Sequence, residues 1–185
     1  MKKFTTLALL CILLFGVVGC SKKDTKEEIV VQYPETYSQL YDTNIAPLSD
    51  YVVYTDVQSV NDYYKNNDYP GNEAYLKKVK DAYKDSRDKI QTFVNGLKND
   101  AKTDDKDLKK MNEDLIAVGE NTIKGLDEKI ASLDKITDED YKKTQTDFID
   151  LVDKTVNSTD KIGDKFKDML KKMNEKLGLD KNTTK

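Results

Sequence analysis

The chain of 185 residues carries 34 acidic and 31 basic side chains, for a formal net charge of −3, and it has neither histidine nor tryptophan. Without histidine, it cannot build a Ser-His-Asp or Cys-His catalytic site or a histidine-ligated metal centre. An acidic protein is also a poor ligand for phosphate backbones, which argues against nucleic acid as a partner. Composition therefore restricts the function to classes that need neither histidine chemistry nor a basic surface.

The first twenty residues, MKKFTTLALLCILLFGVVGC, have the pattern of an export signal. Lys2 and Lys3 provide a positive start, and the apolar run over 7–18 has the length of a secretory core, too short to span a bilayer. We expect cleavage after Gly19. Cys20 would then be the sole cysteine of the mature chain, which excludes an intrachain disulfide.

The end of this run, Val17-Val18-Gly19-Cys20, resembles the lipobox of bacterial lipoproteins, although the family more often has leucine where Val17 stands. The resemblance implies that residues 1–19 are a lipoprotein signal peptide and that Cys20 receives a diacylglyceryl thioether. Two acyl chains hold a protein stably at a bilayer, so the resemblance implies a lipid anchor on the extracytoplasmic face of the cell membrane. The alternative is an ordinary signal peptide followed by a chance cysteine.

From this predicted membrane location we expect the chain to have four parts. Residues 1–19 are the signal peptide, and residues 20–32 are the lipidated cysteine and a flexible tether with a reach of roughly 20 Å. Residues 33–178 form a helical domain, and residues 179–185 form a disordered tail. Leu, Ile, Val and Phe make up only about one in five mature residues, which suits long helices with narrow apolar stripes.

The first helical segment extends from Pro34 to about residue 66. Pro34 suits the first position of a helix, and apolar residues recur at helical spacing on both sides of Pro47. Because proline disrupts a helix interior, we expect a kink or a break at Pro47. The run over 51–54, Tyr-Val-Val-Tyr, could also be read as a strand, but a single short strand would have no partner.

Two longer helices come next, over 73–99 and 104–133, each with an apolar stripe. Asn72 is the expected N-cap of the first, and Thr103 or Asp104 that of the second. Gly119 and Gly125 weaken the second helix. Close helix packing explains these glycines, and a hinge is the alternative.

The pattern is most regular in the last helix, which we expect over 138–177. Thr137 is its expected N-cap, and Gly178 marks its end. Apolar and small polar residues alternate four and three apart, the spacing of a coiled-coil seam. Short polar links before this helix and before residue 104 favour antiparallel neighbours. The sequence therefore predicts an all-α, elongated antiparallel bundle of about four helices, with the first kinked or split at Pro47.

Carboxylates are the only candidate catalytic groups. They gather at 104–107 and 138–140, where capping and the helix dipole explain them. Neither group has the order of a calcium loop, and the glycines form no phosphate-binding loop. We therefore expect no enzyme activity, no metal site and no cofactor.

Tyrosine is the most informative residue type, because ten of the eleven tyrosines lie between residues 33 and 83. Those on the apolar stripes are expected in the core: Tyr37, Tyr41, Tyr75 and Tyr83. Exposed tyrosines among Asn and Asp residues can stack on sugars or anchor a protein partner. The candidate binding surface comprises Tyr54, Tyr63, Tyr64 and Tyr69. The alternative is that these tyrosines fill a thin core.

The sequence favours a non-enzymatic, membrane-anchored surface lipoprotein whose helical bundle binds a cell-wall glycan, another envelope component or a surface protein. Prophage superinfection-exclusion lipoproteins are similar in type, being small, charged, helical and lipid-tethered. The alternative function is therefore to block phage DNA entry at the membrane.

Overall fold

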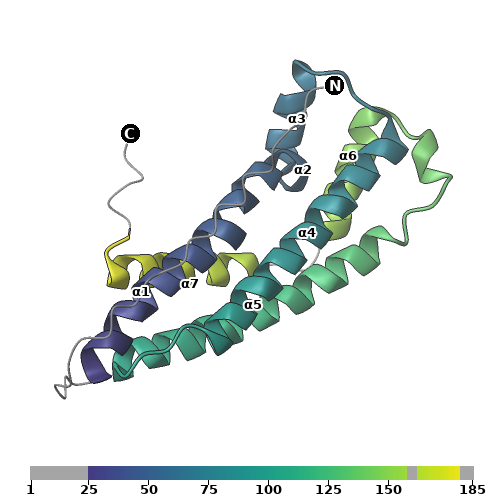
Figure 1. The fold of residues 1–185 in the computed structure, drawn as a ribbon. Coiled ribbons are helices and arrows are strands. Elements are labelled where there is room, and N and C mark those ends of the chain that lie inside the picture. The colour runs from purple at the N-terminus through teal and green to yellow at the C-terminus, as the bar shows by residue number, and fades with distance from the viewer. Residues whose placement is uncertain (1–24, 158–161, 180–185) are drawn as a thin grey trace, which may run out of the picture.

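The computed structural model describes residues 25–157 and 162–179, and these residues form helices with no strand among them (Figure 1). The all-α bundle is thereby confirmed. Within these two ranges, seven α-helices and two 3-10 helices follow one another: α1 (Thr25–Asn44), η1 (Ala46–Tyr51), α2 (Val52–Thr55), α3 (Val57–Lys65), α4 (Asn72–Asn99), α5 (Lys106–Leu133), η2 (Asp140–Lys142), α6 (Gln145–Asn157) and α7 (Ile162–Leu177).

The antiparallel pair α4 and α5 forms the spine of the molecule (Figure 1). Each helix has 28 residues and therefore extends about 42 Å. Ion pairs link the two helices toward both ends, Lys80 to Asp134 at 2.8 Å and Lys98 to Glu120 at 2.5 Å. These pairs are largely solvent-exposed, so each contributes at most about 1 kcal/mol.

Two hydrophobic cores lie along this spine. Core 1 joins α1 and α7 to the second half of α4 and the first half of α5. Core 2 joins α3 and α6 to the first half of α4 and the end of α5. Each core thus brings together segments of four helices, but different helices pair with the spine in the two halves. The prediction of about four helices therefore fits each half of the bundle but not the described chain as a whole.

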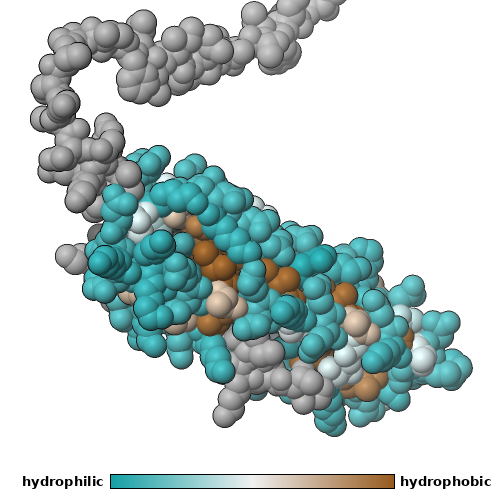
Figure 2. All heavy atoms as spheres, turned by 90° about the horizontal axis from the view of Figure 1, so that it is seen from below, coloured by the Kyte–Doolittle hydropathy of each residue, from teal (hydrophilic) through white to brown (hydrophobic). Residues whose placement is uncertain are grey.

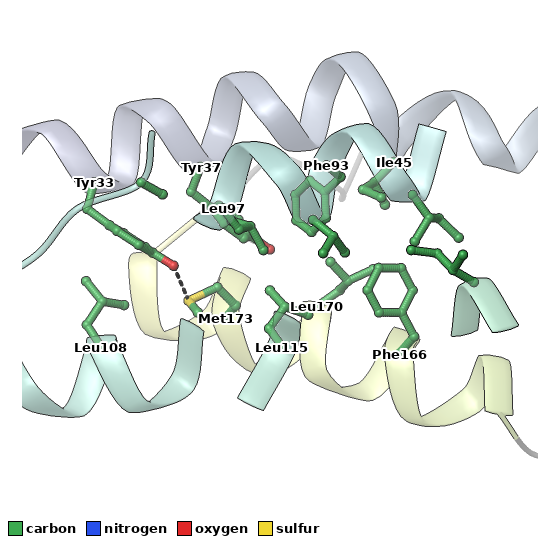
Figure 3. Packing of buried hydrophobic residues seen from close by; sticks show 14 residues of the cluster. Tyr33, Tyr37, Ile45, Phe93, Leu97, Leu108, Leu115, Phe166, Leu170 and Met173 are labelled. Carbon is green, nitrogen blue, oxygen red and sulfur yellow. Dashed lines mark hydrogen bonds between the residues drawn. The ribbon is translucent and has the colours of Figure 1, made fainter. Parts of the chain in front are cut away.

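Core 1 contains buried hydrogen bonds that fix α1 against its neighbours, and Figure 3 shows the one between Tyr33 and Met173. The hydroxyl of Tyr33 donates to Oδ1 of Asn112 at 2.8 Å and lies 4.0 Å from Sδ of Met173. Nδ2 of Asn112 donates to the carbonyl of Leu97 at 3.3 Å, and the Tyr37 hydroxyl donates to Oδ1 of Asn174 at 2.9 Å. Because these bonds join α1 to α5 and α7, a slip of α1 along the spine would leave buried polar atoms unpaired.

The break near Pro47 is confirmed, since α1 ends at Asn44 and Pro47 lies in η1. Two other expectations for this segment are wrong. Pro34 lies inside α1 rather than at its start, and the flexible tether predicted over 20–32 is helical from Thr25 onward. The residues over 26–28, Lys-Glu-Glu, all have high helix propensity, and this outweighs the cost of a proline one turn or more further on.

Both spine helices begin and end close to their predicted limits, but their N-caps differ from the prediction. α4 is capped by Gly71, which has φ +92°, and Asn72 is the first helical residue. α5 is capped by Asp105, whose carboxylate accepts hydrogen bonds from the backbone N–H groups of Asp107 and Leu108, both at 2.9 Å. The predicted caps Thr103 and Asp104 lie outside the helix, two residues and one residue too early, respectively.

The single helix predicted over 138–177 is wrong. In its place are η2, α6 and α7, and α6 begins after Thr144, whose Oγ1 accepts from the N–H of Asp147 at 3.2 Å. α6 is described to Asn157 and α7 from Ile162, and residues 158–161 between them lie outside the described residues. The alternating stripe is real, but its first half packs in core 2 and its second half in core 1.

The end of α7 confirms the predicted stop at Gly178, which has φ +69°. The N–H of Leu179 donates to the carbonyl of Asn174 at 2.9 Å, and the Leu179 side chain packs on core 1. The predicted tail therefore loses its first residue to the bundle, and 180–185 lie outside the described residues. So do the predicted signal peptide and Cys20.

Apolar residues also reach the surface. Viewed from below, they form an interrupted row along the molecule between hydrophilic flanks (Figure 2). Partly buried apolar side chains border both cores, among them Ile116, Val118, Leu126, Ile130 and Met169. This exposure follows from the narrow stripes of the helices, which do not cover one another completely.

Candidate binding surface

The structure brings the four candidate tyrosines to one end of the bundle, which we call the tyrosine end. It comprises α2, α3, residues 66–71, the start of α4 and residues 134–144. The ring of Tyr64 meets those of Tyr63 and Tyr69 edge-on, with centroids 5.0 and 5.1 Å apart. Tyr54 packs against core 2 from α2. Tyr63, Tyr64 and Tyr69 thus belong to one aromatic cluster that continues into core 2 through Tyr75, and Tyr54 joins the same core.

Only one of the four is strongly exposed. Tyr63 has 36% of its surface exposed, whereas Tyr64 has 9% and counts as core, and Tyr54 and Tyr69 are intermediate. The hydroxyl of Tyr64 is buried and has no hydrogen-bond partner within the described chain. Burial raises the pKa of Tyr64, and the neighbouring Tyr54 and Tyr63 raise it further. The core-filling alternative is therefore correct for Tyr64, and the accessible surface centres on Tyr63.

Tyr69 has a structural task at this end. Its hydroxyl donates to Oδ1 of Asn72 at 2.7 Å, and Nδ2 of Asn72 donates to the carbonyls of Tyr141 and Lys143 at 3.0 and 2.8 Å. Burial also raises the pKa of Tyr69 well above its usual value, so the hydroxyl stays protonated and can donate. Asn72, expected as a helix cap, instead joins two loops that are 69 residues or more apart in the sequence.

We expect Asn72→Ala to lower the free energy of unfolding by about 1–2 kcal/mol, because it leaves two carbonyls and the Tyr69 hydroxyl without their partner. Urea denaturation followed by circular dichroism measures the change. Asn67→Ala is the matched control, since the Asn67 side chain is exposed and donates only to the nearby carbonyl of Tyr63. Equal losses in the two variants would contradict the bridging role of Asn72.

Sequence reasoning missed Val52, which is 45% exposed at the start of α2. Val52 and Tyr63 are the two large apolar residues of the described chain that are strongly exposed, and both lie between α1 and α4. The sequence pattern hinted at an exposed valine but not at which one. In Tyr-Val-Val-Tyr over 51–54, adjacent valines point to different sides of a helix, so the pattern alone does not say which of them is exposed.

The capping interpretation of the acidic groups is confirmed for Asp105, whereas Asp140 closes a turn with Thr137 and caps no helix. Asp105 caps α5, and hydrogen bonds from the N–H groups of Leu108 and Asp107 lower its pKa. Asp140 accepts from the N–H and Oγ1 of Thr137 at 3.0 and 2.9 Å, which lowers its pKa as well. Each carboxylate in the described chain with a displaced pKa has it displaced downward, which stabilises the charged form rather than an acid catalyst. Over the same residues, no three potential metal ligands come together.

The cavity beside the aromatic cluster is too small for an organic ligand. It has a volume of about 10 Å³ and is lined by residues of α2, α3, α4 and α6, including Tyr54, Val60, Tyr75 and Val152. A space of this size holds a single water at most. The sequence around the exposed Tyr63 is rich in amide and carboxylate side chains, from Asn61 and Asp62 to Asn66 and Asn67.

Among the helices in the described ranges, none combines the length and the apolar character needed to cross a bilayer. No protein-family model, no curated protein and no solved structure matches the chain.

Proposed function

We propose that the protein is a lipid-anchored, non-enzymatic binding module on the extracytoplasmic face of the membrane, and that its tyrosine end meets a cell-wall glycan or a surface protein. The observation that carries the proposal is the placement of the two ends. α1 begins five residues after Cys20, beside the start of α5 and the end of α7, whereas Tyr63 lies at the opposite end of the spine (Figure 1).

This arrangement suits a spacer. α4 alone extends about 42 Å between the two ends, so a chain held at Cys20 can present Tyr63 well beyond the lipid headgroups. A rigid bundle with a short connection to its anchor loses little conformational freedom when the far end binds a partner. A tyrosine at that end offers a large apolar ring and a hydroxyl, which suits both sugars and protein surfaces.

The anchor is tested by Cys20→Ser, with Cys11→Ser as the matched control within the segment expected to be removed. We expect Cys20→Ser to move the protein from the membrane fraction to the medium, because no acyl chain would remain to hold it. Cys11→Ser should leave the distribution unchanged. Fractionation and the mass of the mature N-terminus report both results, and unchanged membrane retention of Cys20→Ser would contradict the lipobox interpretation.

The ligand is tested by co-sedimentation of a soluble Ser21–Lys185 chain with isolated cell-wall sacculi at physiological salt. Saturable pelleting that Tyr63→Ala weakens by about tenfold or more would support glycan binding at the tyrosine end. Asn99→Ala, an exposed change at the opposite end of α4, should have no effect. Absence of pelleting would exclude the glycan and favour a protein partner, and a phage-challenge assay would then test the exclusion of phage DNA.

A further inference from the structure

One long segment of the chain has acidic residues and no basic residue. Between Glu27 and Tyr64 the chain has seven acidic residues and no lysine or arginine, the longest such stretch in a protein with 31 basic residues. This stretch covers most of α1 and continues through η1, α2 and α3, which follow one another along one edge of the bundle (Figure 1). The segment without basic residues therefore lies along one edge of the bundle.

Three carboxylates of this segment have no ion-pair partner within the described chain. Glu35, Asp42 and Asp50 are exposed, and no lysine or arginine pairs with any of them. By contrast, Asp56 accepts from the N–H of Ser59 as the cap of α3, and Asp62 pairs with Lys65 at 2.6 Å. The first three charges are therefore available to a partner, while the last two already have structural roles.

The same edge of the bundle also has a shallow hollow and an exposed apolar side chain. A shallow hollow follows the outer side of α1, lined by Glu35 and Asp42 together with neighbouring polar residues and Leu179. Glu35 and Asp42 are seven residues apart, so they lie on one side of the helix about 10 Å from each other. Val52, 45% exposed, comes two residues after Asp50. The lining of the hollow includes no lysine or arginine.

From this charge complementarity we propose that the face formed by Glu35, Asp42, Asp50 and Val52 binds a lysine- or arginine-rich segment of another protein. This inference rests on the proposed binding-module function and specifies its partner. A cationic helix with basic residues every second turn would match the spacing of Glu35 and Asp42, and one apolar side chain would cover Val52. Anionic lipid and anionic wall polymer are repelled by the same charges, which keeps the face free at the membrane.

The test is fluorescence anisotropy with the mature chain, residues 20–185, carrying Cys20→Ser. The probe is a labelled peptide of about 20 residues in which lysine and leucine recur at helical spacing, and its glutamate counterpart is the negative probe. We expect saturable binding of the lysine peptide alone. Its dissociation constant should rise about tenfold or more between low and high salt, because exposed charges are screened.

Two charge-reversal variants separate the face from the net charge. Glu35→Lys/Asp42→Lys/Asp50→Lys should weaken binding of the lysine peptide by at least about tenfold. Glu113→Lys/Asp150→Lys/Asp168→Lys changes the net charge equally at exposed carboxylates on α5, α6 and α7 that also have no ion pair in the described chain. This control should change the dissociation constant less than about threefold. Val52→Ser should weaken binding at both salt concentrations, because its contribution is apolar.

Equal weakening by both reversals, or the absence of saturable binding at low salt, would overturn the proposal. So would self-association of the unmodified chain in sedimentation velocity that the first reversal abolishes, since the face would then be an interface between copies. Circular dichroism melts confirm that the variants fold. Peptide binding at this face and sacculus binding through Tyr63 are separate readouts, so a failure of one is distinguishable from a failure of the other.

Discussion

Phe93→Ala is expected to lower the free energy of unfolding by about 3–5 kcal/mol, the largest single effect among the substitutions considered. Phe93 is fully buried in core 1, and its ring meets those of Tyr37 and Phe166 edge-on, with centroids 5.9 and 6.3 Å apart. These contacts join α4 to α1 and to α7 (Figure 3). Alanine would leave a cavity where three helices meet, and the aromatic partners on either side could not collapse into it together.

Urea denaturation followed by circular dichroism measures the loss. Lys84→Ala is the control on the same helix, because Lys84 is exposed and has no ion pair in the described chain; it should change stability by less than about 0.5 kcal/mol. A loss below about 1 kcal/mol in Phe93→Ala would show that core 1 tolerates the cavity, contrary to the packing described.

Gly119→Val is expected to lower the free energy of unfolding by about 2–3 kcal/mol, because it overpacks the contact between α4 and α5. A Cβ atom at Gly119 would lie 2.5 Å from Cγ2 of Val94 and 3.4 Å from Cε2 of Phe166. Val94 is fully buried and β-branched, so it has little freedom to move aside. This geometry favours the close-packing explanation of Gly119 over a hinge.

A double-mutant cycle tests the cause. Val94→Ala removes the nearest methyl groups, so Gly119→Val should cost clearly less in the Val94→Ala background than in the natural sequence, with a coupling energy of about 1 kcal/mol or more. Unfolding free energies of the four proteins provide the measurement. Additive losses would mean that the cost of valine at position 119 arises elsewhere than at the contact with Val94.

The two spine helices were predictable because their signals are local. An apolar stripe over about eight turns, a proline- and glycine-containing turn before α4 and an aspartate cap before α5 lie within the segments themselves. The break near Pro47 is local for the same reason, since proline disrupts the helix in which it would lie. Gly178 is a further example, because its left-handed conformation ends α7 whatever packs around it.

The site was predictable only in part. The sequence placed the tyrosines together in the chain, and three of the four candidates contact one another. It could not say which of them faces water, because Tyr63 and Tyr64 are neighbours and exposure depends on what packs against α3. Tyr75 on α4 and residues of α6 cover Tyr64, and these lie 11 residues and more than 80 residues away along the chain. The bridging role of Asn72 was not predictable for the same reason, because the carbonyls that accept its hydrogen bonds belong to the distant residues Tyr141 and Lys143.

The sequence alone determined the helical class, the limits of the spine and the position of the first break, since each depends on propensities and periodicity over a few turns. Only the tertiary structure decided that the bundle has two cores. From α1 to α3, the buried residues up to Ile45 pack in core 1, and those from Val60 onward pack in core 2. From α6 to α7 the order is reversed, since Val156 packs in core 2 and Phe166 in core 1. The segment from α1 to α3 is broken at η1, between the two cores, whereas α4 and α5 pass through both of them. A seven-residue repeat indicates that one side of a helix is buried. It does not indicate which helices cover that side, because this depends on contacts between residues far apart in the chain.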